Sequence, residues 1–150
     1  MKKWHYVMIG ILVVIMLGIR GVMIYRGLHQ QGKAALDNLI HVTYPKPNDT
    51  ISSPVTLTGE ARGNWYFEAS FPIMIVDWDG LIIGQGHAEA QGDWMTTEYV
   101  PFKATLEFIR PAISDLNKSY ASRGAVIFKN DNPSGDPSKD VAIEVPVLFK

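Results

Sequence analysis

The sequence has 150 residues, of which 47% are hydrophobic and 19% charged, so a largely disordered chain is excluded and one domain with a small additional segment is expected. It contains no cysteine, which excludes disulfides, a thiolate nucleophile and cysteine-bound zinc. Residues 41–150 hold nine Lys/Arg against fourteen Asp/Glu, which argues against nucleic acid as a partner because phosphate binding requires clustered basic residues.

The first 26 residues have the features of a membrane anchor. No charge occurs from Tyr6 to Ile19, and this apolar stretch has no polar stripe at helical spacing. A span over residues 4–25 supplies the roughly 20 residues that a transmembrane helix needs, with Arg20 close enough to its end to reach the interface. We therefore expect one N-terminal transmembrane helix with the lipid bilayer as its partner, followed by a polar linker over residues 27–40.

Two questions about this segment stay open. A cleaved signal peptide is the alternative to an anchor, although no small-x-small cleavage site directly follows the apolar core. The evidence on the orientation of the span is also divided, because two lysines precede it and three basic residues, Arg20, Arg26 and Lys33, lie near or beyond its other end. A simple count of these charges would place the C-terminal body in the cytoplasm, but long domains can be translocated despite such a count.

The body, residues 41–150, reads as a series of short strands. Apolar residues alternate with polar ones at 55–61, 100–108 and 141–149, which is typical of half-buried antiparallel strands. Turn-forming clusters separate the runs, among them "YPKPND", "QGD" and "NDNPSGDPSKD". The pattern predicts an all-β fold of seven or eight strands, arranged as a two-sheet antiparallel sandwich of the immunoglobulin kind, with a barrel as the alternative.

The stretch "GNWYFEASFPIMIVDWDG", residues 63–80, combines aromatics, a carboxylate and strand-forming residues. We interpret it as a strand with a kink at Pro72 that leads to a hairpin turn at Asp79-Gly80. In a strand, Glu68 would lie on the face opposite Phe67 and Phe71 and would point away from the core.

Four segments of the body resemble a known family. They are "VTYPKPNDTISSPVTLTGEARG", "NWYFEASFPIMIVDWDG", "GDWMTTEYVPFKATLEF" and "VAIEVPVLF", and together they cover roughly residues 42–149. In this order they resemble the bacterial spore-germination immunoglobulin-like domain, of the type found beside the germination-protein-M domain. The resemblance implies an immunoglobulin-like sandwich in a single-pass cell-membrane protein with an extracytoplasmic C-terminal domain. It connects the protein with germination and carries over no catalytic residue.

The candidate ligand-binding residues are Trp65, Tyr66, Glu68 and Trp94. Exposed aromatic faces beside a carboxylate can hold a sugar or a peptide, so these residues would form a binding patch if they lie together on the surface. The alternative is structural, with one or more of the tryptophans in the core and Glu68 on a solvated strand face.

No motif in the chain indicates catalysis, a cofactor or a bound metal. No G-x-S-x-G elbow occurs, no pair of carboxylates lies in a recognisable hydrolase motif, and the four histidines form no H-x-H or H-x-x-x-H pair. We therefore expect a non-enzymatic envelope protein whose domain is a protein-interaction or adhesion module. The alternatives are a binder of cell-wall polysaccharide and a degenerate envelope hydrolase.

Overall fold

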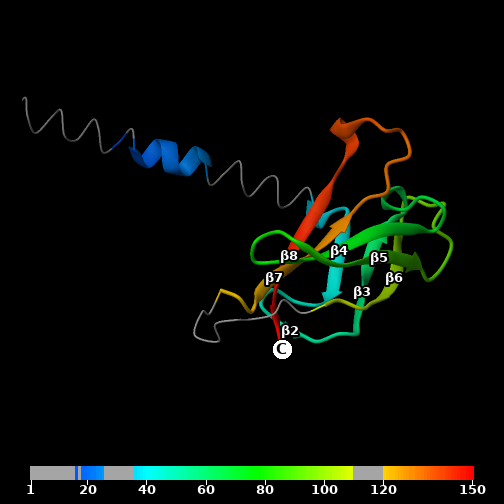
Figure 1. Cartoon of the computed structure of the whole chain (residues 1–150). Coiled ribbons are helices and arrows are strands. Elements are labelled where there is room, and N and C mark those ends of the chain that lie inside the picture. The colour runs from blue at the N-terminus through cyan, green and yellow to red at the C-terminus, as the bar shows by residue number, and fades with distance from the viewer. Residues whose placement is uncertain (1–15, 17, 26–35, 110–119) are drawn as a thin grey trace, which may run out of the picture. The chain divides into compact units, whose positions relative to one another are not determined.

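A computed structural model describes residues 16, 18–25, 36–109 and 120–150 (Figure 1). The chain divides into two compact units, Met1–Asn38 and Leu39–Lys150. In the first unit residues 18–25 are helical, while most of the expected anchor and linker lies outside the described residues. No helix in the described part of the chain combines the length and the apolar character needed to cross a membrane.

The second unit is mostly β, which confirms the predicted all-β class. Its described residues form eight strands and two short 3-10 helices: β1 (Ile40–Tyr44), β2 (Thr50–Ile51), β3 (Val55–Arg62), η1 (Gly63–Trp65), β4 (Ser70–Asp77), β5 (Ile82–Ala90), β6 (Tyr99–Leu106), β7 (Arg123–Lys129), η2 (Pro137–Lys139) and β8 (Ala142–Phe149). The strand order is β1-β3-β6-β5-β4-β7-β8-β2. Every pairing is antiparallel except that of β2 with β8, which is parallel.

This order links all eight strands by hydrogen bonds into one continuous sheet. The two parts of the sheet, β1-β3-β6 and β5-β4-β7-β8-β2, join only at the end of β5, where Glu89 pairs with Lys103 and Ala90 with Phe102. Elsewhere on β5, Gly84 and Gly86 carry no side chain, so Phe108 and Leu106 pack directly against its backbone. The sheet is not a closed barrel, because its end strands β1 and β2 are not paired with each other in the described residues.

The alternation of apolar and polar residues in the sequence corresponds to an alternation of buried and more exposed residues along the strands. Inward-facing residues of β3, β6 and β8 are buried, while their neighbours face solvent. Phe71 lies at the centre of this core and makes edge-to-face contacts with Trp65, Tyr66 and Phe102. Burial of such large apolar side chains contributes about 2–3 kcal/mol each, so the core accounts for the main favourable term in folding.

The segment 63–80 is more broken than the predicted strand. It begins as the 3-10 helix η1, makes a tight turn between Phe67 and Ser70, and becomes a strand only at β4. The hairpin at Asp79-Gly80 is confirmed: β4 pairs with β5, and Gly80 has a φ of +82°. The carboxylate of Asp77 fixes this turn by accepting hydrogen bonds from the backbone amides of Asp79 and Leu81, at 3.0 and 2.9 Å.

Candidate functional site

Two of the four predicted binding residues lie in the core. Trp65 is 2% exposed and Tyr66 4% exposed, so neither presents a ring face to solvent. The expectation of an exposed aromatic pair is therefore wrong. The physical reason is that η1 interrupts strand alternation at this point, so both adjacent side chains turn inward toward Phe71.

The hydroxyl of Tyr66 is satisfied inside the core, where it donates a 2.7 Å hydrogen bond to the backbone carbonyl of Val100. Burial raises the pKa of Tyr66 far above its ordinary value, because the phenolate would lose its hydration. The residue is therefore a neutral hydrogen-bond donor that joins the end of η1 to β6. This role is structural and leaves the hydroxyl no free capacity to donate to a ligand.

Glu68 lies in a turn and not in a strand. The prediction that it lies on the outward face of a strand is therefore corrected. Glu68 and Ala69 have φ values of +49° and +64°, and Phe67 and Ser70 exchange two backbone hydrogen bonds across them. Positive φ at both central residues is typical of the tight turns that match the twist of β-strands. The side chain of Glu68 is exposed, as expected, but beside a turn and with no exposed Trp65 or Tyr66 next to it.

Trp94 is half-buried and packs against the edge of the core. It lies in the loop between β5 and β6, and this loop contacts η1: the amide of Gly63 donates to the carbonyl of Glu98 at 3.2 Å. The carbonyl oxygens of Trp94 and Thr96 occupy the space that a Cβ on Gly63 would need. The structure thus places the backbone of Trp94 beside the helix that holds Trp65, but it does not form an exposed aromatic surface from them.

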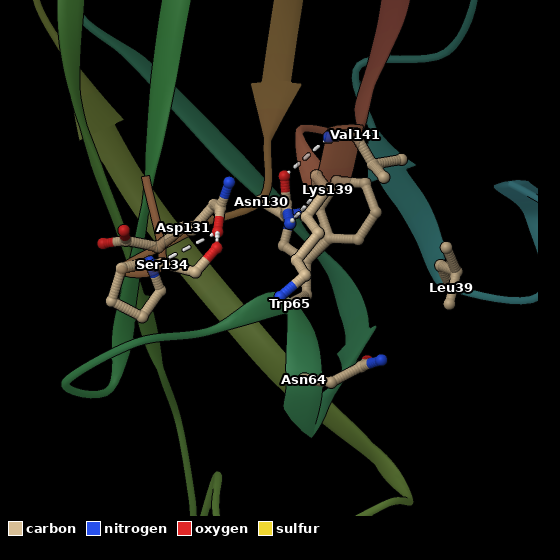
Figure 2. A pocket seen from close by; sticks show the side chains of 10 residues that line it. Leu39, Asn64, Trp65, Asn130, Asp131, Ser134, Lys139 and Val141 are labelled. Atoms are coloured by element: carbon tan, nitrogen blue, oxygen red, sulfur yellow. Dashed lines mark hydrogen bonds between the residues drawn. The ribbon is translucent and has the colours of Figure 1, made fainter. Parts of the chain in front are cut away.

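A cavity of about 390 Å³ opens beside Trp65 (Figure 2). Its walls come from the start of the domain, from η1 and from the connection between β7 and β8: Leu39, Asn64, Trp65, Asn130, Asp131, Asn132, Pro133, Ser134, Lys139 and Val141. Amide, carboxylate, hydroxyl and ammonium groups therefore surround a few apolar side chains. The sequence cluster "NDNPSGDPSKD" signalled the turns of this wall but gave no indication that they adjoin Trp65.

Hydrogen bonds hold the β7–β8 connection in place. The side chain of Asn130 donates to the carbonyl of Lys139 at 3.1 Å and accepts from the amide of Val141 at 2.7 Å, which closes the loop at its base. Asn132 donates 2.8 Å hydrogen bonds to the carbonyl of Asp136 and to the carboxylate of Asp140. The amide of Asp131 then donates to the carbonyl of Trp65 at 3.0 Å, which fixes the loop to η1.

Two carboxylates in this connection have lowered pKa values. Ser138 donates to Asp136 through both its hydroxyl and its backbone amide, and these bonds favour the ionised carboxylate. The pKa of Asp140 is lowered by the amide of Asn132 and by Lys129, whose ammonium lies 3.0 Å from its carboxylate. Both groups stabilise the loop itself, and neither lines the cavity.

A second feature is an exposed apolar cluster at the opposite end of β4, which we call the Trp78 patch. It comprises Trp78, Leu81, Ile82 and Tyr120, with exposed fractions of 51%, 66%, 49% and 40%. The rings of Trp78 and Tyr120 meet at a centroid distance of 4.7 Å and an angle of 61°. In the sequence Trp78 stands directly before the Asp79-Gly80 turn, which is a signal that it lies at a hairpin tip.

Within the described ranges no group of three or more His, Cys, Asp or Glu side chains is arranged to hold a metal ion. Residues 39–117 match a protein-family model, the immunoglobulin-like domain of bacterial spore germination. This match covers more than half of the chain and begins just before β1. Comparisons with curated proteins and with solved structures gave no match.

Proposed function

We propose, on the premise that this chain belongs to the family of immunoglobulin-like domains of bacterial spore germination, that it is a membrane-anchored, non-enzymatic interaction module of the cell envelope. Its domain would bind another envelope protein, and the N-terminal segment would hold it at the cell membrane as a single-pass anchor. The domain would lie on the extracytoplasmic side. A connection with germination follows from the family's description and is part of the proposal.

The observation that carries the proposal is the Trp78 patch. Monomeric surfaces carry scattered apolar residues, but an exposed tryptophan grouped with a tyrosine and two aliphatic residues is typical of protein-binding surfaces. Trp and Tyr are also the residues that most often dominate the energy of such interfaces. Leu81 and Ile82 add aliphatic area beside the rings, which suits an apolar protein surface better than the hydroxyl-rich surface of a polysaccharide.

The alternative of a polysaccharide bound on exposed aromatics is less favoured for a specific reason. Stacking on a sugar requires an open ring face, and Trp65 and Tyr66 have none. The third candidate, a degenerate hydrolase, has no observation that favours it.

Site-specific photo-crosslinking in cells tests the interaction. A photoreactive residue at Leu81 should give a protease-sensitive adduct, and Trp78→Ser should abolish it. Met95, which is 77% exposed and outside the patch, is the matched control position and should give no such adduct. Equal crosslinking at both positions, or an adduct at Leu81 that Trp78→Ser leaves unchanged, would rule out the Trp78 patch. An adduct resistant to protease but sensitive to glycan digestion would support the polysaccharide alternative.

The anchor and the orientation are tested separately. The apolar stretch Tyr6 to Ile19 supports the anchor, so the full-length protein should fractionate with membranes and leave them only with detergent. Protease added to intact cells from which the wall has been removed should digest residues 41–150. Recovery of the full-length chain in the soluble fraction would contradict the anchor, and protection of the domain would contradict its extracytoplasmic location.

A further inference from the structure

Asp77, the last residue of β4, closes the hairpin turn that carries Trp78. Its amide donates to the carbonyl of Leu81 at 3.0 Å, and its carbonyl accepts from the amide of Gly80 at 3.1 Å. A glycine with positive φ, here +82°, is typical of hairpin loops that contain a bulge. Because Gly80 takes the carbonyl of Asp77, the amide of Leu81 needs another acceptor.

A single oxygen of the Asp77 side chain supplies this acceptor. Its Oδ1 accepts from the amide of Leu81 at 2.9 Å and also from the amide of Asp79 at 3.0 Å. Since both bonds end on one oxygen, an asparagine in the same place could accept them with the carbonyl oxygen of its side chain. The structure therefore requires an acceptor at this position, and the geometry of the two bonds does not depend on a negative charge.

These bonds fix the two members of the Trp78 patch that flank the turn. Trp78 directly follows Asp77, and its ring contacts that of Tyr120 at a centroid distance of 4.7 Å. Asp77 binds both backbone groups of Leu81, although the side chain of Leu81 is 66% exposed. Exposed side chains on a mobile turn lose conformational entropy when a partner orders them, and a turn that is already fixed lowers this cost.

We propose that Asp77 is a positioning residue for partner binding: its Oδ1 holds the hairpin tip, before the partner arrives, in the conformation that presents Trp78 and Leu81. This inference rests on the proposed function, because it concerns the same patch, and it adds a residue that acts through the turn without contacting the partner. Loss of the acceptor reduces the fraction of molecules with a competent turn, and the apparent affinity falls in proportion.

Two substitutions separate the acceptor from the charge. Asp77→Ala removes both Oδ1 bonds, whereas Asp77→Asn keeps an acceptor oxygen and removes only the charge. Amide hydrogen exchange, followed by NMR on the ¹⁵N-labelled full-length protein in detergent micelles, reports on the turn in the absence of a partner. The Leu81 amide should exchange about tenfold faster in Asp77→Ala, while its exchange in Asp77→Asn should stay close to that of the unmodified protein.

The photo-crosslinking described above then measures binding in cells, with the photoreactive residue at Leu81. The yield of the protein adduct should fall about fivefold to tenfold in Asp77→Ala and should return to within about twofold of the original yield in Asp77→Asn. Asp93→Ala is the matched control. The carboxylate of Asp93 accepts from the amide of Met95 at 3.0 Å in an exposed loop outside the patch, so its loss should leave the yield unchanged.

The inference is overturned if Asp77→Ala leaves either the exchange of the Leu81 amide or the adduct yield unchanged, or if Asp77→Asn loses the adduct as fully as Asp77→Ala does. Faster exchange throughout the core strands of Asp77→Ala would assign Asp77 to global stability and would also overturn it. Absence of any adduct in the unmodified protein is a different result, because it contradicts the proposed function. The exchange of the Leu81 amide then still decides whether Asp77 positions the turn.

Discussion

The hydroxyl of Tyr66 lies 2.7 Å from the backbone carbonyl oxygen of Val100, 34 residues later in the chain, and donates a buried hydrogen bond to it. Tyr66→Phe keeps the ring packed against Phe71 but leaves that carbonyl without this donor. We expect the free energy of unfolding to fall by about 1–2 kcal/mol, measured by urea denaturation. Tyr44→Phe is the control: this tyrosine is 37% exposed, so its substitution should change stability by less than about 0.5 kcal/mol. Equal effects of the two substitutions would contradict the assigned role of the Tyr66 hydroxyl.

The turn at Glu68 and Ala69 predicts a stabilising substitution. Ala69 has a φ of +64°, a conformation that costs a residue with a Cβ about 1–2 kcal/mol and costs glycine almost nothing. After the greater backbone entropy of glycine in the unfolded chain is subtracted, Ala69→Gly should raise the free energy of unfolding by about 0.5–1 kcal/mol. Ala142→Gly, at an exposed position of β8, should lower it by a similar amount. A loss of stability in Ala69→Gly would show that the turn differs from the one described.

Gly63 is expected to tolerate no side chain. A Cβ at this position would overlap the carbonyl oxygens of Thr96 and Trp94, which are backbone atoms and cannot rotate away. Gly63→Ala should therefore destabilise the domain by about 2–3 kcal/mol, visible as a lower melting temperature. Gly92→Ala is the matched control in the neighbouring loop, because the nearest atom to its Cβ would be 4.0 Å away. If the two variants have the same melting temperature, the contact between η1 and the β5–β6 loop is not as close as described.

The β7–β8 connection should loosen in acid. The pKa values of Asp136 and Asp140 lie below 3.8 in the folded chain, so both carboxylates stabilise the loop fully above that pH. Their contribution is lost as the pH falls through the lowered folded values, because protonation removes the acceptors that hold Ser138, Asn132 and Lys129. Amide hydrogen exchange at Ser138 should accelerate there relative to exchange in the core strands.

The control for this pH dependence is Ser138→Ala, which removes the hydroxyl that donates to Asp136 at 2.8 Å. The carboxyl-carbon titration of Asp136 should then move up toward its ordinary midpoint, while that of Asp140 should change less. An Asp136 midpoint at or above 3.8 in the unmodified protein would contradict the hydrogen-bonded geometry of the loop.

The all-β class, the family and the core-facing residues of the long strands could all be predicted from the order of amino acids. Val55 and Leu57, or Val100 and Phe102, could be assigned to the core because a pleated strand buries alternate residues whatever its neighbours are. The hairpin after Asp77 was readable for a similar reason: the Asp79-Gly80 pair and its flanking strands act over a few residues. These features depend on local backbone chemistry, which the order of residues encodes directly.

The positions of the candidate site residues, in contrast, depend on contacts between distant parts of the chain. Strand parity put Glu68 on an outward strand face, but hydrogen bonds across Phe67 and Ser70 place it in a turn, and η1 turns Trp65 and Tyr66 into the core. The cavity forms because Asp131 is held against Trp65, a contact between residues 66 positions apart. Pairing of distant segments depends on the packing of the whole domain, and no short stretch of sequence contains that information.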